Sequence, residues 1–363
     1  MTKKYFKDLK KIKESLETDG TKMMFYHADA DGVCSGVLLA RYFDGFEYQS
    51  RKGPSMDNKF TNYLIEKKPD VLVFLDMPVD QEWKQLNKLI RELPKLKIIV
   101  IDHHIYEKNM NSRNIIHINP KIQEDVYIPV SYLIYKMIEL FGMNVKEDIW
   151  ISSIGIIGDY GIECTDVLDE TRKKYPKLLG KDIFKSMLAE GAEMINSAAT
   201  MRGYKGLDEV FKSLLKAHSF ADFGETTKFR KWRDDVNKEV DSLLKTFEKE
   251  KKKKDSKLAE IHQDLKLIFY LLETEMSVSS TVSTLFTKKY HDEVILIIRK
   301  IEDGYKISSR CQSGRVDVAA LMRKATKGIG GGGGHAKAAG AFTTDLGIFK
   351  SRVVRELKKS INK

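Results

Sequence analysis

One stretch of the chain decides its fold: Tyr26-His27-Ala28-Asp29-Ala30-Asp31-Gly32. It follows the short apolar run Met23 to Tyr26 and precedes a helical pattern from Val33 to Tyr42. Two carboxylates one residue apart at the end of a strand point the same way, and they repel each other unless a positive charge lies between them. A divalent cation would remove this repulsion. The alternative is that Asp29 or Asp31 caps the N-terminus of the helix.

Composition limits the partners and the compartment. A chain of 363 residues is long enough for about two domains, each with its own core. The formal net charge is +11 and the sequence pI is about 9.2, which favours polyanionic partners, nucleic acid first. Three cysteines without a paired spacing indicate a reducing, cytoplasmic setting. No apolar run reaches the length of a membrane span and the N-terminus does not resemble a secretion signal, so we expect no membrane partner.

Two further apolar runs have the length of strands and end in ionisable residues. Val71 to Leu75 ends in Asp76, and Ile98 to Ile101 ends in Asp102-His103-His104. Such runs are typical of strands buried on both faces of a parallel sheet. Further strands are expected at 46–52 and 114–118. Helices are expected at 4–18, 58–67, 81–92, 130–141 and, with a strand as the alternative, at 151–157, just before Gly158-Asp159-Tyr160-Gly161.

The alternation of strands and helices predicts an α/β fold with a doubly wound parallel sheet, in which ligands bind at the carboxyl ends of the strands. The ionisable residues at those ends are His27, Asp29, Asp31, Asp76, Asp102, His103 and His104. Any one of them could be a helix cap or a turn residue, but their recurrence at one edge favours a metal centre. Mixed carboxylate and imidazole ligands suit manganese, zinc or iron better than calcium. So many carboxylates argue against a single structural zinc and for two ions that share one carboxylate.

The rest of the chain predicts a helical linker and a smaller C-terminal α/β domain. From about 191 to 257 the pattern is helical and highly charged, with a lysine run that is either a solvated helix face or a contact with nucleic acid. Strands are expected at 265–271, 293–299 and 305–310, and helices at 280–290 and 317–324. We therefore predict a metal-binding domain at 1–195, a helical linker at 196–262 and a second domain at 263–363.

Five consecutive glycines, Gly330 to Gly334, precede His335. A flexible linker is the usual interpretation of such a run, because glycine loses backbone entropy on folding and has no side chain to pack. His335 and a series of small residues follow at once, however, and we interpret these as the start of a helix. Glycines at that point would let backbone N–H groups approach a phosphate, with the helix dipole assisting.

Together these motifs resemble those of the DHH phosphoesterase family. In chain order they are His-x-Asp-x-Asp-Gly at 27–32, the isolated Asp76, Asp-His-His at 102–104 and Gly-Asp-Tyr-Gly at 158–161. The glycine run with His335 resembles the glycine-rich His motif of the DHH-associated C-terminal domain. The resemblance implies hydrolysis of phosphoester or phosphoanhydride bonds with two metal ions, usually Mn²⁺, for which Mg²⁺ or Co²⁺ are possible substitutes.

The resemblance also implies a role for each motif residue. One ion would be held by His27, Asp29 and Asp76, and the other by Asp31, Asp76, His103 and Asp159, so that Asp76 bridges them. Asp102 would orient its neighbours, and His104 would face the scissile phosphate, while water between the ions attacks the phosphodiester. Many members place the first histidine four residues before the first aspartate, where this chain has Phe25; the position of His27 resembles archaeal RecJ-like members instead.

In the C-terminal domain the resemblance implies a grip on substrate phosphates. The residues concerned are Arg310, Ser308, Gly332, Gly333, Gly334, His335 and Lys337. The expected function is that of an archaeal RecJ-like exonuclease acting on single-stranded DNA or RNA, with replication and repair proteins as further partners. One alternative is a nanoRNase or adenosine bisphosphate phosphatase acting on very short oligonucleotides. The other is a RecJ-like replisome scaffold, which should have lost several metal ligands, whereas here every motif position is filled.

Overall fold

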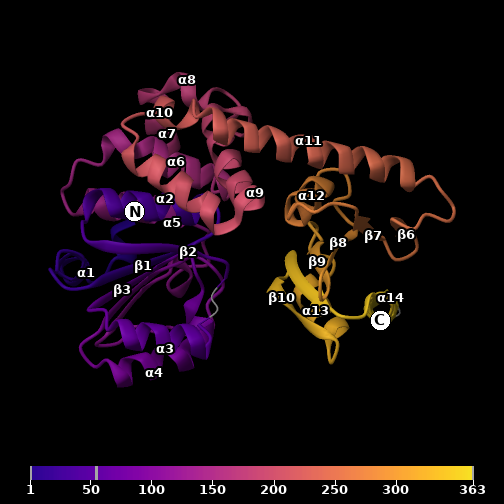
Figure 1. Cartoon of the computed structure of the whole chain (residues 1–363), viewed down its shortest axis with the longest axis horizontal. Helices are drawn as coiled ribbons and strands as arrows, with labels where there is room; N and C mark the ends of the chain where they lie inside the picture. The colour runs from indigo at the N-terminus through magenta and orange to yellow at the C-terminus, as the bar shows by residue number, and fades with distance from the viewer. Residues whose placement is uncertain (1, 54–55, 362–363) are drawn as a thin grey trace. The chain divides into compact units, whose positions relative to one another are not determined.

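A computed structural model of the chain describes residues 2–53 and 56–361 (Figure 1). The chain divides into two compact units, Met1–Arg233 and Asp234–Lys363. The boundaries expected from the sequence, with a separate linker at 196–262, stay a prediction. Among the helices in the described ranges, none combines the length and the apolar character needed to cross a bilayer.

The first unit is built around a parallel sheet with the strand order β2-β1-β3-β4-β5. All neighbouring strands pair in parallel, which confirms the predicted doubly wound α/β fold. The strand order reverses between β1 and β3, and in such sheets ligands bind at this switch point, beyond the carboxyl ends of the strands. The strands are β1 (Lys22–His27), β2 (Phe46–Arg51), β3 (Val71–Leu75), β4 (Lys97–Ile101) and β5 (Ile115–Ile118).

Helices cover both faces of this sheet (Figure 1). Phe25 and Phe74 point toward α3 (Asn58–Lys67) and α4 (Trp83–Glu92), and pack there with Leu64 and Leu89. The next residue of β1, Tyr26, points to the opposite face, which is covered by α2 (Ala30–Tyr42), α5 (Val130–Leu140) and α6 (Ile149–Gly158). Because both faces of the sheet are buried, β3 and β4 have the continuous apolar sequences from which they were predicted.

The unit contains further helical segments besides those on the two faces of the sheet. The helix predicted at 4–18 is shorter than expected, the one at 81–92 begins with a 3₁₀ turn, and 151–157 is helical as predicted. The α9 helix bends at Gly203, whose φ is 58°. The segments are α1 (Leu9–Leu16), α7 (Thr165–Lys174), α8 (Pro176–Leu179), α9 (Met187–Lys216), α10 (Phe220–Gly224), the first part of α11 (Thr227–Glu250), and the 3₁₀ turns η1 (Thr2–Tyr5), η2 (Val79–Glu82), η3 (Pro120–Ile122), η4 (Lys146–Asp148) and η5 (Ile183–Lys185).

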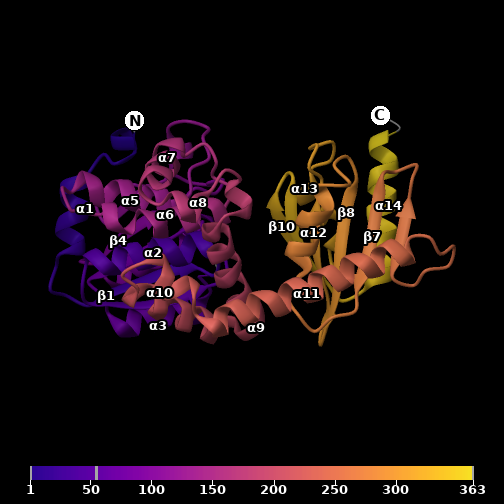
Figure 2. The ribbon, with the colours of Figure 1, turned by 90° about the horizontal axis from the view of Figure 1, so that it is seen from above.

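The second unit holds a mixed sheet with the strand order β10-β11-β9-β8-β7-β6. On one face Phe269 packs with Met322 of α13 and Phe349 of α14, which lies along the sheet (Figure 2). On the other face the Tyr270 ring meets Phe247 of α11 and Phe286 of α12. The elements are β6 (Ala259–His262), β7 (Leu267–Leu272), α12 (Ser279–Thr287), β8 (Val294–Ile301), β9 (Gly304–Arg310), α13 (Val318–Thr326), β10 (Gly330–His335), β11 (Ala338–Thr343) and α14 (Leu346–Ile361).

The glycine run forms a strand, so the prediction that it leads into a helix after His335 was wrong. β10 pairs antiparallel with β11, and the small residues from Ala338 onward form that second strand. The reason is a close approach to α13. A Cβ atom added to Gly332 would lie 2.9 Å from Cβ of Met322, so only glycine lets this strand lie directly against the helix. The run therefore has a packing role, contrary to the expectation from the sequence.

Candidate metal centre

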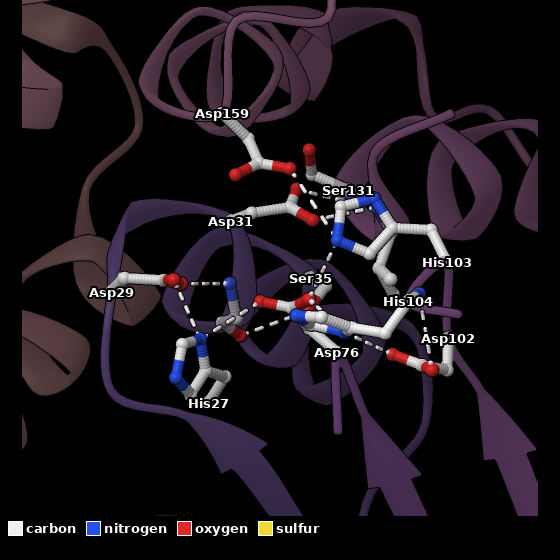
Figure 3. Close-up of polar contacts among 12 residues, drawn as sticks. His27, Asp29, Asp31, Ser35, Asp76, Asp102, His103, His104, Ser131 and Asp159 are labelled. Atoms are coloured by element: carbon white, nitrogen blue, oxygen red, sulfur yellow. Dashed lines mark hydrogen bonds and ion pairs between the residues drawn. The ribbon is translucent and has the colours of Figure 1, made fainter. Parts of the chain in front are cut away.

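The predicted metal ligands meet at the carboxyl ends of the strands (Figure 3). His27 ends β1, Asp76 follows β3, His103 lies just beyond β4, and Asp159 follows α6. Within the described residues, three groups place one ligand atom per residue within 4.8 Å of one another: His27 with Asp29 and Asp76, Asp31 with His103 and Asp159, and Asp76 with His103 and His104. Segments far apart in the sequence thus form one cluster.

Asp76 lies between the two halves of the cluster. Its Oδ2 is 3.3 Å from Nδ1 of His27, and its Oδ1 is 3.1 Å from Nε2 of His103. The backbone reaches this position with φ at 59°, a conformation that non-glycine residues adopt at a cost and that is common at functional sites. The two oxygens of one buried carboxylate therefore face two different sets of ligands, as a bridging ligand must.

The first half of the cluster consists of His27, Asp29 and Asp76, and Asp29 is also a helix cap. Nδ1 of His27 lies 2.6 Å from Oδ2 of Asp29. The other oxygen of Asp29, Oδ1, accepts the N–H of Gly32 at 3.0 Å and caps α2. The cap interpretation is thus confirmed for Asp29, and it leaves Oδ2 directed at His27. A Cβ on Gly32 would lie 2.3 Å from the carbonyl oxygen of His27, so glycine is required where the helix starts beside the strand.

The second half of the cluster is held by the start of α5 and by a tyrosine. Both oxygens of Asp31 accept backbone N–H groups, from Val130 at 2.6 Å and from Ser131 at 2.9 Å. The N-terminus of a helix favours a negative charge at this position. Oδ2 of Asp159 lies 3.5 Å from Nε2 of His103 and accepts the hydroxyl of Tyr127.

The buried charges of this cluster shift one another's pKa values. Burial and the charge of Asp76 raise the pKa of Asp31 to about 7. Burial raises the pKa of Asp159 to about 8, although His103 opposes the rise. Burial alone would lower the pKa of His103, but Asp76 and Asp159 outweigh it and raise this pKa to about 10. The protein without metal therefore balances the carboxylates by holding protons, which a cation would displace.

The donor set fits divalent metal ions. Oδ1 of Asp76 and Nδ1 of His27 are buried, and neither has a hydrogen bond of acceptable geometry among the described residues, although charged neighbours are close. Orphaned polar atoms of this kind are costly unless something else binds them. Carboxylate oxygens together with imidazole nitrogens suit first-row divalent ions.

Asp102 is placed to hold His104 rather than to bind a metal itself. Its Oδ1 lies 2.7 Å from Nδ1 of His104, and its Oδ2 accepts the backbone N–H of the same residue at 3.2 Å. The amide of Asn119 donates to the carbonyl of His104 at 2.9 Å, which fixes the same turn. Burial would raise the pKa of Asp102, but the bond with His104 lowers it. A charged Asp102 in turn favours the protonated His104 ring, whose own pKa is raised despite burial.

The predicted substrate-binding residues share one region of the second unit. Strand pairing places Ala338 of β11 between His335 and Arg310, and Gly340 between Gly333 and Ser308. The guanidinium of Arg310 lies 3.3 Å from the hydroxyls of Ser280 and Thr284 in α12. Gly334 pairs with Ala339, Gly332 packs on α13, and Lys337 lies in the turn between β10 and β11. Their role in binding stays a prediction.

Two residues near the cluster, Arg51 and Tyr127, were missed by the sequence analysis. Arg51 ends β2 beside His27 in register, and its guanidinium lies 3.6 Å from the Phe60 ring centroid. Arg51 lies near the end of the strand predicted at 46–52. The rule that ligands bind at the carboxyl ends of parallel strands would therefore have identified it. Tyr127, which donates to Asp159, lies in a loop, where no such rule applies. Asn196 of α9 accepts the N–H of Ala30, at the start of α2, at 3.1 Å.

Comparison with known proteins agrees with this architecture. Two family models match, the DHH family N-terminal domain over residues 23–157 and the DHHA1 domain over residues 264–363. No curated protein sequence gave a significant match. Three of the matching solved structures illustrate the shared fold at low sequence identity.

The first is a DHH-domain protein described as a member of the s1p family of ribosomal proteins, with a TM-score of 0.73, 15% identity, and coverage of 98% of this chain and 90% of that one. The second is exonuclease RecJ bound to manganese, with a TM-score of 0.71, 16% identity, and coverage of 99% and 96%. The third is CDC45 from Entamoeba histolytica, with a TM-score of 0.59, 11% identity, and coverage of 98% of both chains.

Proposed function

This chain is a member of the DHH family, with the family's N-terminal domain followed by a DHHA1 domain, and we propose that it is a metal-dependent phosphodiesterase acting as an exonuclease on single-stranded DNA or RNA. The observation that carries the proposal is the position of Asp76, whose two oxygens face His27 on one side and His103 on the other. One shared carboxylate between two sets of ligands is the arrangement used by two-metal phosphodiesterases.

Two ions are proposed, held by His27, Asp29 and Asp76 and by Asp31, Asp76, His103 and Asp159. Bound there, Mn²⁺, or Mg²⁺ or Co²⁺ in its place, would supply a water nucleophile at neutral pH and neutralise charge on the phosphoryl oxygens. The donor chemistry supports this choice, and so does the manganese in the RecJ structure of the same fold.

The protein side chains would position the substrate and handle a proton. Asp102 holds the His104 ring through Nδ1. Burial lowers the pKa of His104, but the contact with Asp102 outweighs it and raises this pKa above its ordinary value, which favours the protonated ring. His104 is therefore proposed to donate a hydrogen bond to the scissile phosphate or a proton to the leaving oxygen. Tyr127 and the start of α5 fix Asp159 and Asp31, so these carboxylates need no rearrangement when the substrate arrives.

Nucleic acid is the proposed substrate for three reasons. The net charge of +11 attracts polyanions, and the DHHA1 domain carries Arg310, Lys337 and the glycine-rich strand in one region. The RecJ structure of the same fold is that of an exonuclease. Replication or repair proteins are proposed as further partners.

A replisome scaffold is the second candidate, favoured by the likeness to CDC45 over nearly the whole of both chains. A protein with only this role has no need of metal ligands, yet all seven positions of the cluster, including His104, carry ionisable side chains that meet in space. A nanoRNase acting on very short oligonucleotides is the alternative within the enzyme class.

The test is a digestion series on end-labelled DNA and RNA strands, from dinucleotides to long single strands, with Mn²⁺ supplied. The proposal predicts stepwise shortening of long single strands, while Asp76→Ala is inactive and Arg310→Ala mainly raises KM. If the protein cleaves dinucleotides or adenosine bisphosphate but not long strands, the exonuclease proposal is wrong and the nanoRNase function takes its place. If the protein hydrolyses none of these substrates, the replisome scaffold becomes the better candidate function.

A further inference from the structure

The end of α6 carries a tyrosine where a glycine is usual. The N–H of Gly161 donates to the carbonyl of Ile156 at 2.8 Å, and that of Tyr160 donates to Ile157 at 3.2 Å, which together form a Schellman cap. In this cap the residue at the Tyr160 position adopts the left-handed conformation, and here φ is 57°. Glycine adopts it freely, whereas a side chain with a Cβ atom makes it unfavourable.

The Tyr160 side chain lies on the surface and not in the core. Tyr160 is 57% exposed and its neighbour Phe184 is 44% exposed. The two rings contact each other, with centroids 5.3 Å apart and planes at 37°. Phe184 lies in η5, just before α9, so two distant segments place aromatic rings side by side on the surface. Both rings leave about half of their surface in water, and an unfavourable backbone conformation of this kind is often found where a side chain has a function.

Tyr160 is next in the chain to a residue of the metal cluster. Tyr160 directly follows Asp159, whose carboxylate faces His103, and consecutive Cα atoms are about 3.8 Å apart. Phe184 is followed by Lys185, whose side chain is 84% exposed. The pair therefore offers flat apolar surface that starts one residue from a proposed metal ligand, and Lys185, which follows Phe184, also pairs with Asp182 at 3.5 Å.

We propose that Tyr160 and Phe184 form a stacking platform for an unpaired nucleobase of the strand whose phosphate is held at the metal cluster. The inference rests on the proposed function and adds how the strand is gripped. Base stacking on exposed aromatic side chains is the usual means by which proteins hold single strands without reading their sequence. Two side chains are too small an area for a stable protein interface, which buries about 800 Å² on each partner, but they match the size of one base.

The test compares Tyr160→Gly and Phe184→Ala with a matched control, Lys68→Gly. Lys68 ends α3 in the same left-handed conformation, with φ at 51°, and is also exposed. Binding of a fluorescently labelled single-stranded oligonucleotide is measured by anisotropy with Mn²⁺ present, with all proteins carrying His104→Asn so that hydrolysis is slow. A second oligonucleotide has the same backbone but lacks bases.

Both aromatic variants should bind the normal strand about tenfold more weakly, and the base-free strand as the wild type does. Tyr160→Gly should keep or raise the melting temperature, as Lys68→Gly does, while Lys68→Gly leaves binding unchanged. Equal losses on both strands, no loss on either, or a fall in melting temperature with Tyr160→Gly would each overturn the platform. If the wild-type protein binds the normal strand more tightly than the base-free strand but hydrolyses neither, the proposed function is refuted and the platform stands.

Discussion

The bridging position of Asp76 makes a quantitative prediction about metal-linked stability. We expect Asp76→Asn to abolish most of the stabilisation by Mn²⁺, and Asp29→Asn to abolish only about half. Asparagine is a suitable replacement at both positions, since it tolerates the left-handed backbone of residue 76 and can cap α2 in place of Asp29. Asp76 faces both sets of ligands, whereas Asp29 belongs to one.

The magnitude follows from the linkage between binding and folding. At a Mn²⁺ concentration one hundred times Kd, each occupied site stabilises the folded state by about 2.7 kcal/mol. The first unit, Met1–Arg233, has an unfolding entropy of about 0.5 kcal/mol/K at about 2.1 cal/mol/K per residue. One site should therefore raise the melting temperature by about 5 °C, and two sites by about 10 °C.

The assay is differential scanning calorimetry of each variant with Mn²⁺ and with a chelator. The relevant quantity is the shift caused by the metal, because each substitution also changes the stability of the metal-free protein. We expect about 10 °C for the wild type, about 5 °C for Asp29→Asn and close to zero for Asp76→Asn. Equal shifts for the two variants would show that Asp76 does not bridge two ions. No shift in the wild type would refute the proposed metal centre.

Three other predictions concern the pH dependence, the proton carrier and the glycine strand. The pKa of Asp159 is raised from 3.8 to about 8 and that of His103 from 6.5 to about 10, so the metal-free protein should lose stability as pH rises from about 4 to about 8 through Asp159 and from about 6.5 to about 10 through His103. Mn²⁺ must displace these protons and therefore binds more tightly as pH rises. Melting curves against pH with Mn²⁺ and with a chelator should diverge, and parallel curves would contradict the assignment. His104→Asn should lower kcat by about 10²–10⁴ with little change in the Mn²⁺-induced melting shift, and a loss of that shift would make His104 a metal ligand instead. Gly332→Ala should cost about 1–3 kcal/mol in urea unfolding because its Cβ would meet α13, while Gly331→Ala, which faces open space, should cost far less; equal effects would exclude the packing explanation.

The sequence by itself determined the first unit's sheet and most of the residues at its edge. Continuous apolar runs such as Val71 to Leu75 identify buried parallel strands, and a parallel sheet brings the residues that follow its strands to one edge. Asp76 and His103 could therefore be predicted as neighbours although 26 residues lie between them in the chain. This reasoning depends only on periodicity and topology.

The tertiary structure decided what periodicity does not encode. A run of glycines has no side-chain pattern, so the β10–β11 hairpin could not be distinguished from a loop or a helix start until α13 was seen against Gly332. The orientation of the two Asp76 oxygens depends on a backbone conformation at φ 59° that the residue type does not specify. Tyr127 reaches Asp159 from a loop, and loops place side chains through contacts distant in sequence rather than through a local repeat.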